Sequence, residues 1–181
     1  MFNTVTRRFH HVGRFLAAAA LAFGALQSIP LAQAASAPAS APEFTGIEKW
    51  LNSEPLTLQS LRGKVVLVDF WTYTCINCIR TLPYVTDWYR KYKDQGLVVV
   101  GVHTPEFPFE RLTANVEKAI GRFGITYPVA QDNQYATWDA YRNSYWPAVY
   151  LIDKQGNVVY KHFGEGKYKE TEAEIVRLLG Q

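Results

Sequence analysis

Cysteine is scarce in this sequence of 181 residues. Cys75 and Cys78 are the only two cysteines, and the chain has four histidines and one methionine. A zinc site built on the two cysteines would need two further ligands. After residue 34 the only histidines are His103 and His162, which are far apart in the sequence. This scarcity of ligands argues against a structural zinc centre, and we expect neither a metal nor another cofactor.

Acidic residues are absent from the first 42 positions of the chain, and the first one is Glu43. Three arginines precede a mostly apolar stretch at residues 15–26, and small residues follow at 32–34. This pattern is typical of a secretory signal peptide. We predict a cleaved signal over residues 1–34 and a location in the periplasm or another extracytoplasmic space. An uncleaved anchor and a twin-arginine export signal stay open as alternatives.

An excess of one charge is also lacking once the signal is removed. The whole chain has 19 Lys and Arg against 16 Asp and Glu, and three of the arginines fall within residues 1–34. The remaining chain is formally neutral, whereas a strong basic excess is the usual mark of proteins that bind nucleic acids or acidic membranes. We therefore expect no nucleic-acid partner.

Hydrophobic periodicity predicts one α/β domain over residues 44–181, after a small-residue and proline linker at 35–43. Strands are predicted at 65–71, 97–102, 127–130, 148–152 and 158–163, with a short edge strand at 55–58. Helices are predicted at 75–94, 110–123, 133–141 and 170–179, while 44–50 is either a short helix or irregular. The order strand, helix, strand over residues 65–102 predicts a parallel pair with a right-handed crossover.

Two predicted helices have faces that we expect to point inward. In residues 110–123 this face includes Leu112, Val116 and Ile120, and in residues 170–179 it includes Ile175 and Val176. The segment 103–109 contains two prolines and is predicted to be a loop.

Cys75 and Cys78 are separated by two residues at the start of a predicted helix. A disulfide that closes so small a loop removes little entropy from the unfolded chain, so it would be an inefficient structural staple. The first turn of a helix favours a thiolate, which is the nucleophile of disulfide exchange. We therefore interpret the pair as a redox site, with a structural disulfide as the open alternative.

Asp69 lies in the middle of the predicted buried strand that leads to the cysteines. A buried carboxylate costs several kcal/mol unless it is protonated or paired, about 3–5 kcal/mol for an unpaired buried charge. We expect a raised pKa for Asp69 and a role as a general acid and base for the thiol of Cys78. Anchoring by a lysine such as Lys64 is the structural alternative.

Trp146 and Pro147 stand immediately before a predicted strand. An X-Pro bond in such a position can be cis, and a substrate segment could then pair with the exposed backbone of Trp146. From the residues alone, a trans proline that begins a strand is the open alternative. Trp71, Tyr73 and Trp146 could form an apolar platform around the dithiol, although such aromatic residues are commonly part of a core.

Several motifs together resemble the thioredoxin fold over residues 55–180. They are Asp69 in the strand, the Cys75-x-x-Cys78 pair, Pro83 in the helix and the Trp146-Pro147 step. The predicted signal and the added helix at 110–123 resemble the TlpA/redoxin-like branch of extracytoplasmic thioredoxins. Segments 71–78, 101–107 and 162–166 resemble the thioredoxin-like domain attached to DipZ-type membrane electron transporters, a domain that we expect to stand alone here.

The resemblance implies an α/β thioredoxin fold: a central mixed sheet flanked by helices, with an extra helix inserted after the second core strand. It implies that Cys75 attacks a substrate disulfide, Cys78 resolves the mixed disulfide and Asp69 handles the proton. It also implies a cis Pro147 that holds the substrate strand together with the Trp146 backbone. The residues between the cysteines are Ile76 and Asn77 rather than Gly-Pro, which leaves the direction of electron flow open.

The sequence thus predicts an extracytoplasmic thiol-disulfide oxidoreductase. We expect it to reduce disulfides of exported proteins and to receive electrons from a membrane thiol-disulfide donor. Because Thr72-x-x-Cys75 matches part of a peroxiredoxin site, a thiol peroxidase that uses Cys75 is the alternative enzyme. A binding module with a permanently oxidised pair is the non-enzymatic alternative.

Overall fold

The computed structural model describes Met1 and residues 39–180. Residues 2–34 of the predicted signal lie outside the described residues. Within residues 39–180 no helix is both long enough and apolar enough to cross a membrane. The elements in chain order are β1 (Ala39–Ser40), β2 (Lys49–Leu51), β3 (Val65–Trp71), α1 (Ile76–Tyr92), the 3₁₀ turn η1 (Lys93–Gln95), β4 (Leu97–His103), the 3₁₀ turn η2 (Pro108–Arg111), α2 (Thr113–Phe123), β5 (Val129–Gln131), α3 (Ala136–Ala140), β6 (Ala148–Ile152), β7 (Asn157–Phe163) and α4 (Tyr168–Leu179).

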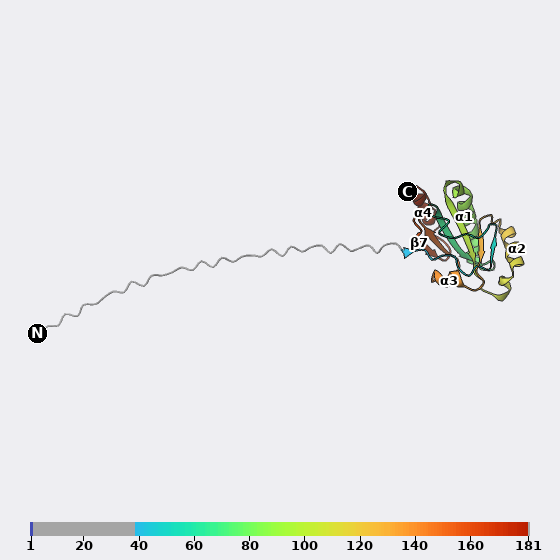
Figure 1. Ribbon diagram of the computed structural model, residues 1–181, viewed down its shortest axis with the longest axis horizontal. Helices are drawn as coiled ribbons and strands as arrows, with labels where there is room; N and C mark the ends of the chain where they lie inside the picture. Colours follow the sequence, from blue (N-terminus) through green and yellow to red (C-terminus); the bar gives the residue numbers. More distant parts are fainter. Residues whose placement is uncertain (2–38, 181) are drawn as a thin grey trace. The chain divides into compact units, whose positions relative to one another are not determined.

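A mixed sheet with the strand order β1-β7-β6-β3-β4-β5-β2 forms the centre of the domain (Figure 1). β3 pairs in parallel with β4 and antiparallel with β6, so this fully buried strand is central, as its apolar run requires. β6 and β7 form an antiparallel hairpin. The predicted parallel pair and hairpin are confirmed. The carboxyl ends of β3 and β4 lie side by side, with Trp71 opposite His103.

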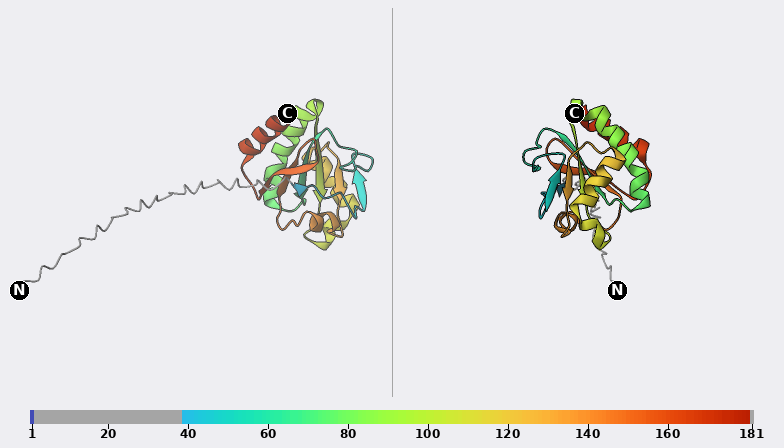
Figure 2. Two further views of the ribbon diagram at one scale, coloured as in Figure 1. Left: turned by 60° about the vertical axis from the view of Figure 1, so that its left-hand side comes forward. Right: turned by 90° about the vertical axis from the view of Figure 1, so that its right-hand side faces the viewer.

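Side chains alternate along β3 and divide the core between the two faces of the sheet. The apolar odd-numbered residues between Val65 and Trp71 pack with α1, α2 and α4. The even-numbered residues between Val66 and Phe70 pack with Trp138 of α3 and with leucines that precede β3. Figure 2 shows α1 and α4 side by side in both views. Asp69 belongs to the odd-numbered series, so its side chain is directed to the face that α1 covers.

The predicted edge strand at residues 55–58 is wrong. Thr57 and Ser60 instead exchange hydrogen bonds between their hydroxyls and backbone N–H groups, which forms a turn. Leu58 is buried against the sheet face, so the apolar alternation reflects packing of a loop rather than strand pairing. The strand of this region is β2, which ends the segment 44–50 and pairs antiparallel with β5.

Part of the predicted linker at 35–43 belongs to the sheet. Ala39 and Ser40 form β1, which pairs with Val158 and Asn157 of β7. The pattern of small residues and prolines did not predict this strand, because an edge strand held by backbone hydrogen bonds needs no apolar alternation.

The helix predicted over residues 110–123 consists of two elements. Leu112 has an extended backbone (φ −73°, ψ 115°) between η2 and α2, and its side chain is 60% exposed. The expectation that Leu112 points inward is therefore wrong, because the break changes which side chains face the sheet. Val176 is also exposed, since Ile175 and Leu178 occupy the buried face of α4. The extra helix after the second core strand is confirmed as α2.

Candidate active site

Cys75 is the N-cap residue of α1, just beyond the carboxyl end of β3. Its Sγ accepts the backbone N–H of Cys78 at 3.2 Å. A side-chain acceptor at this position satisfies one of the free N–H groups of the first turn, and the helix dipole favours a negative charge there. Cys75 is half-buried, whereas Cys78 is only 1% exposed. Of the two sulfurs, Cys75 is the one that a protein substrate can reach.

The two thiols differ strongly in acidity. The hydrogen bond from the Cys78 thiol is the largest cause that lowers the pKa of Cys75 to about 7, against the opposing effect of burial. The N–H groups of Cys78 and Asn77 lower this pKa further, while Glu106 raises it. Burial is the main reason that the pKa of Cys78 lies well above its ordinary value, and Cys75 and Asp69 add to the effect. A substantial fraction of Cys75 is therefore thiolate at neutral pH, and Cys78 is a thiol.

Asp69 is 1% exposed, and burial, followed by the neighbouring Cys75, raises its pKa to about 7. The prediction of a raised pKa is confirmed. Among the described residues no cation forms an ion pair with Asp69, so the alternative of an anchoring Lys64 is not supported. A carboxyl group with this pKa can both take and return a proton near neutral pH.

Trp71 lies beneath the site, in the core. Its side chain has no exposed surface, so the prediction that Trp71 contributes to an apolar platform for the substrate is wrong, and the alternative of a core residue is confirmed. Gly101 pairs with Asp69 in the sheet, and a Cβ atom there would lie 3.0 Å from both Trp71 Nε1 and Tyr127 Cε2. Within residues 39–180, the indole N–H of Trp71 and the hydroxyl of Tyr127 have no hydrogen-bond partner. Two neutral donors thus flank the position opposite Asp69.

The Trp146-Pro147 peptide bond is cis, as predicted. Because Ala148 pairs with Phe70, Pro147 lies at the end of the sheet where β3 leads to Cys75. The half-buried Trp146 donates its indole N–H to the carbonyl of Thr104 at 3.1 Å. Gly164 donates to the carbonyl of Pro147 at 2.8 Å. The backbone N–H and carbonyl of Trp146 make no hydrogen bond within residues 39–180.

Tyr73 and His103 form a stacked pair beside the cysteines, with ring centres 5.6 Å apart. Tyr73 is half-buried, and its hydroxyl donates to the carbonyl of Phe109 at 3.1 Å. The prediction that His103 lies in a loop is wrong. It is the last residue of β4, where it is fully buried. Burial lowers its pKa to about 4, so the imidazole is neutral at pH 7 and supports the Tyr73 ring.

Glu110 is a residue of the site that the sequence did not reveal. Its carboxylate is fully buried and accepts hydrogen bonds from the N–H and hydroxyl of Thr74 and from the N–H groups of Glu106 and Phe107. Burial raises its pKa, but these hydrogen bonds outweigh burial and the net shift is downward. The signal available in the sequence was Pro108 followed by Glu110, a pattern typical of the first turn of a helix.

The assembled site combines an accessible thiolate at a helix N-terminus, a buried thiol and a buried carboxyl group that titrates near neutral pH. This arrangement suits thiol-disulfide exchange, in which one sulfur attacks and the second resolves. In the part of the chain that the structure describes, no three His, Cys, Asp or Glu side chains are grouped so that they could hold a metal ion. Fold and site together define a thioredoxin-fold protein whose two cysteines are placed as thiol-disulfide exchange requires.

Comparison with known proteins agrees with this class. The redoxin family model matches residues 36–179, and the chain therefore belongs to the redoxin family. The chain is 56% identical over 143 residues to Protein DipZ of Mycobacterium bovis, a match that covers 77% of this chain and spans only 21% of the length of DipZ. It is 34% identical over 140 residues to the thiol-disulfide oxidoreductase YkuV of Bacillus subtilis, covering 77% of this chain and 94% of YkuV.

Solved structures confirm the predicted fold. A crystal structure of a thioredoxin-like superfamily protein is 30% identical and superimposes with a TM-score of 0.73, over 79% of this chain and 97% of that protein. The solution structure of a thioredoxin-like protein in its oxidised form is 33% identical with a TM-score of 0.73, over 79% and 96% of the two chains. The chain thus shares the thioredoxin fold of these two solved structures.

Proposed function

We propose that the protein is an extracytoplasmic reductase that passes electrons from a membrane thiol-disulfide donor to oxidised exported proteins. The observation that carries this proposal is the contrast between the accessible Cys75, with a pKa of about 7, and the buried Cys78, whose pKa is raised. The basic and apolar pattern of residues 1–34 supports export. The resemblance to the domain attached to DipZ-type membrane electron transporters supports a membrane donor.

In the proposed reaction, the Cys75 thiolate attacks one sulfur of a substrate disulfide. A mixed disulfide forms, and the other substrate sulfur leaves as a thiolate that takes a proton from solvent. Cys78 then transfers its proton to Asp69 and attacks the Sγ of Cys75. The second substrate sulfur leaves and receives that proton, so two electrons have passed to the substrate and the Cys75–Cys78 disulfide remains. The membrane dithiol reverses these steps and restores the reduced protein.

The substrate segment is proposed to bind beside the cis Pro147. The free N–H and carbonyl of Trp146 can pair with an extended substrate backbone, as an added strand pairs with a sheet edge. The indole of Trp146 is held by its hydrogen bond to Thr104, and the Tyr73 ring is held by its stacking on His103. Tyr73 and Trp146 are thus assigned to substrate binding, together with Pro147.

No observation favours the peroxidase alternative. The Thr72 hydroxyl, which that reading would place beside the reactive sulfur, is fully buried and lies 3.3 Å from Nε2 of His103. A peroxide assay with the reduced protein checks this directly, because consumption of hydrogen peroxide that depends on Cys75 would favour the peroxidase.

The proposed function is tested by the reduction potential of the Cys75–Cys78 pair and by turnover on a protein disulfide. Equilibration with glutathione buffers should give a potential well below the value of about −120 mV of a dedicated oxidant. Reduction of insulin should be lost in Cys75→Ser and retained in Lys93→Gln, a change at the far end of α1. A potential near that of the oxidant, or insulin reduction by Cys75→Ser, would contradict the proposal.

The direction and the partners are tested in cells. Cys78→Ala leaves Cys75 without its resolving thiol, so mixed disulfides with substrates and with the donor should accumulate. Exported proteins and one membrane protein among the trapped partners would support the proposal, whereas only cytoplasmic partners would contradict it.

A further inference from the structure

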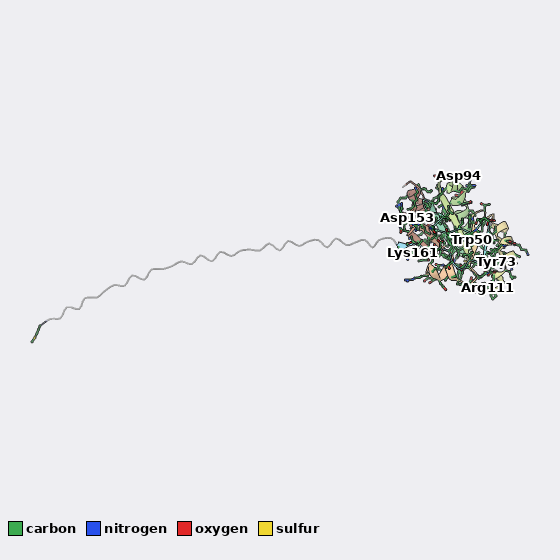
Figure 3. All side chains as sticks on the ribbon, viewed as in Figure 1. Trp50, Tyr73, Asp94, Arg111, Asp153 and Lys161 are labelled. Atoms are coloured by element: carbon green, nitrogen blue, oxygen red, sulfur yellow. The ribbon has the colours of Figure 1, made fainter. Side chains whose placement is uncertain are left out.

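A groove of about 370 Å³ lies beside the active site, between the chain that precedes Cys75 and helix α2. Its lining combines aromatic rings with two basic side chains: Tyr73, Phe109, Asn115, Lys118, Ala119, Arg122 and Phe123. Tyr73 is two residues before Cys75, so one wall of the groove continues directly into the reactive loop. Figure 3 shows Tyr73 and Arg111 on the same side of the domain, away from Asp94.

Hydrogen bonds connect the walls of this groove, which we call the α2 groove. The carbonyl of Phe109 accepts hydrogen bonds from the Tyr73 hydroxyl at 3.1 Å and from the Asn115 side chain at 3.0 Å. The Glu110 carboxylate joins the same segment to Thr74. The α2 groove is therefore held in a fixed position relative to Cys75, and a ligand in it has a defined distance to the reactive sulfur.

The two basic side chains of the α2 groove lie on α2. Asn115, Lys118 and Arg122 are spaced so that they share one face of α2. No described acidic residue forms an ion pair with Lys118 or Arg122, and no acidic residue lines the groove. By contrast, Arg90 and Lys91 of α1 are both paired with Asp87.

Aromatic rings lie close to these charges. The Arg122 guanidinium lies 5.1 Å from the centre of the Phe123 ring, and Phe109 is exposed at the opposite wall. The α2 groove thus presents aromatic surface together with two cations that form no ion pair with a described residue, which complements a carboxylate close to an apolar side chain.

We propose that the α2 groove binds an acidic segment of the substrate protein, close to the cysteine that Cys75 attacks. The occupant is a stretch of polypeptide with an aspartate or glutamate beside an apolar residue. This inference rests on the proposed function, because it assigns the groove to the substrate of the same dithiol. The site is separate from the Trp146 backbone, which would pair with the substrate main chain, and it would select among substrates by their side chains.

The test uses three peptides whose single cysteine is joined to nitrothiobenzoate. They carry acidic, amide or basic side chains on both sides of a phenylalanine next to the cysteine. Attack by the Cys75 thiolate joins the peptide to Cys75 and releases nitrothiobenzoate, whose absorbance gives the second-order rate constant. The variants are Lys118→Gln/Arg122→Gln and a control of equal charge change, Lys64→Gln/Lys93→Gln.

The control residues lie far from the α2 groove. Lys64 precedes the amino end of β3, and Lys93 follows α1, whose 17 residues separate it from Cys75 by about 25 Å. Neither forms an ion pair with a described residue. Figure 3 places Asp94, the neighbour of Lys93, at the end of the domain away from Tyr73.

The wild type should react faster with the acidic peptide than with the amide peptide. In Lys118→Gln/Arg122→Gln the ratio of these two rates should fall about fivefold, the size expected when two exposed charge pairs are lost. The control variant should keep the wild-type ratio, and salt at about 1 M should reduce it. An unchanged ratio in Lys118→Gln/Arg122→Gln, or an equal fall in the control, would overturn the proposal.

A binding measurement separates this proposal from the proposed function. The same peptides with serine in place of cysteine are titrated into the ¹⁵N-labelled protein. Shifts of the α2 amides with the acidic peptide, absent with the basic peptide, would support the α2 groove even if no peptide reacts with Cys75. Lack of such shifts would overturn it, whatever the redox activity of the dithiol.

Discussion

The carboxylate of Glu110 accepts both the hydroxyl of Thr74, at 2.5 Å, and the backbone N–H of Thr74, at 3.3 Å. Thr74 is the residue immediately before Cys75, so the buried carboxylate holds the chain at the point where it enters α1. Through its other oxygen Glu110 also accepts the N–H groups of Glu106 and Phe107. One side chain therefore fixes the reactive loop against the segment that follows β4.

Glu110→Gln should lower the free energy of unfolding by about 2–3 kcal/mol, because the amide group would face N–H donors that a carboxylate accepts. Cys75 should also react more slowly with iodoacetamide, since its loop loses a support. Because the folded pKa of Glu110 is lowered, its contribution is present above the ordinary pKa of 4.5 and disappears as the pH falls below it. Urea unfolding at pH 7 and pH 4 measures this.

Glu106→Gln is the matched control for Glu110→Gln. Glu106 is exposed, so its substitution should change stability by less than about 0.5 kcal/mol. It should lower the pKa of Cys75, because the charge of Glu106 raises that pKa. Equal destabilisation by both substitutions would contradict a special role for Glu110.

Asp69 should make the reduced protein less stable as the pH rises from about 4 to 7. Its pKa is raised to about 7 in the folded state, so the folded protein keeps a proton that the unfolded chain has already lost. A shift of this size corresponds to about 4 kcal/mol across that window. Asp69→Asn should remove this dependence, which urea unfolding of the reduced protein at several pH values detects. Asp94→Asn is the exposed control and should keep the wild-type slope; a wild-type slope in Asp69→Asn would refute the assignment.

Much of the site follows from local sequence features. Cys75 and Cys78 are two residues apart at a helix start, and Asp69 interrupts a buried apolar strand, so each residue is conspicuous by type and place. The prediction of a cis Pro147 came from the resemblance to the thioredoxin fold rather than from Trp146-Pro147 alone. The predictions for Cys75, Cys78 and Asp69 required only the order of elements and the chemistry of single residues.

The remainder depended on tertiary contacts that no local pattern contains. Glu110 resembles an ordinary residue at a helix start, and only the meeting of two distant segments buries it against Thr74. Trp71 was predicted to contribute to an apolar platform for the substrate, with a core position as the alternative, and the structure places it in the core, packed close to Gly101. Leu112 was assigned to the wrong face because the extended backbone at this residue separates η2 from α2, so one helical periodicity does not run through residues 110–123.

Substitutions at Cys78 should separate its electrostatic effect from its resolving role. The hydrogen bond from the Cys78 side chain is the largest cause of the lowered pKa of Cys75, which is about 7. Cys78→Ala removes this donor, so the midpoint of the Cys75 titration, followed by thiolate absorbance at 240 nm, should rise above 7. Cys78→Ser keeps an O–H donor and should give a lower midpoint than Cys78→Ala. Identical midpoints in the two variants would show that the backbone N–H groups alone set the acidity.

Gly101→Ala should destabilise the protein although it adds a single methyl group. The new Cβ would lie 3.0 Å from Trp71 Nε1 and from Tyr127 Cε2, and both side chains are fully buried. Overpacking of this kind costs about 1–3 kcal/mol, which urea unfolding measures. Gly121→Ala is the control: nothing lies within 4 Å of its Cβ position, and alanine in the exposed face of α2 should stabilise the protein by up to about 1 kcal/mol. If Gly101→Ala were as stable as the wild type, Trp71 and Tyr127 would have room to shift, and the close packing opposite Asp69 would not constrain the site.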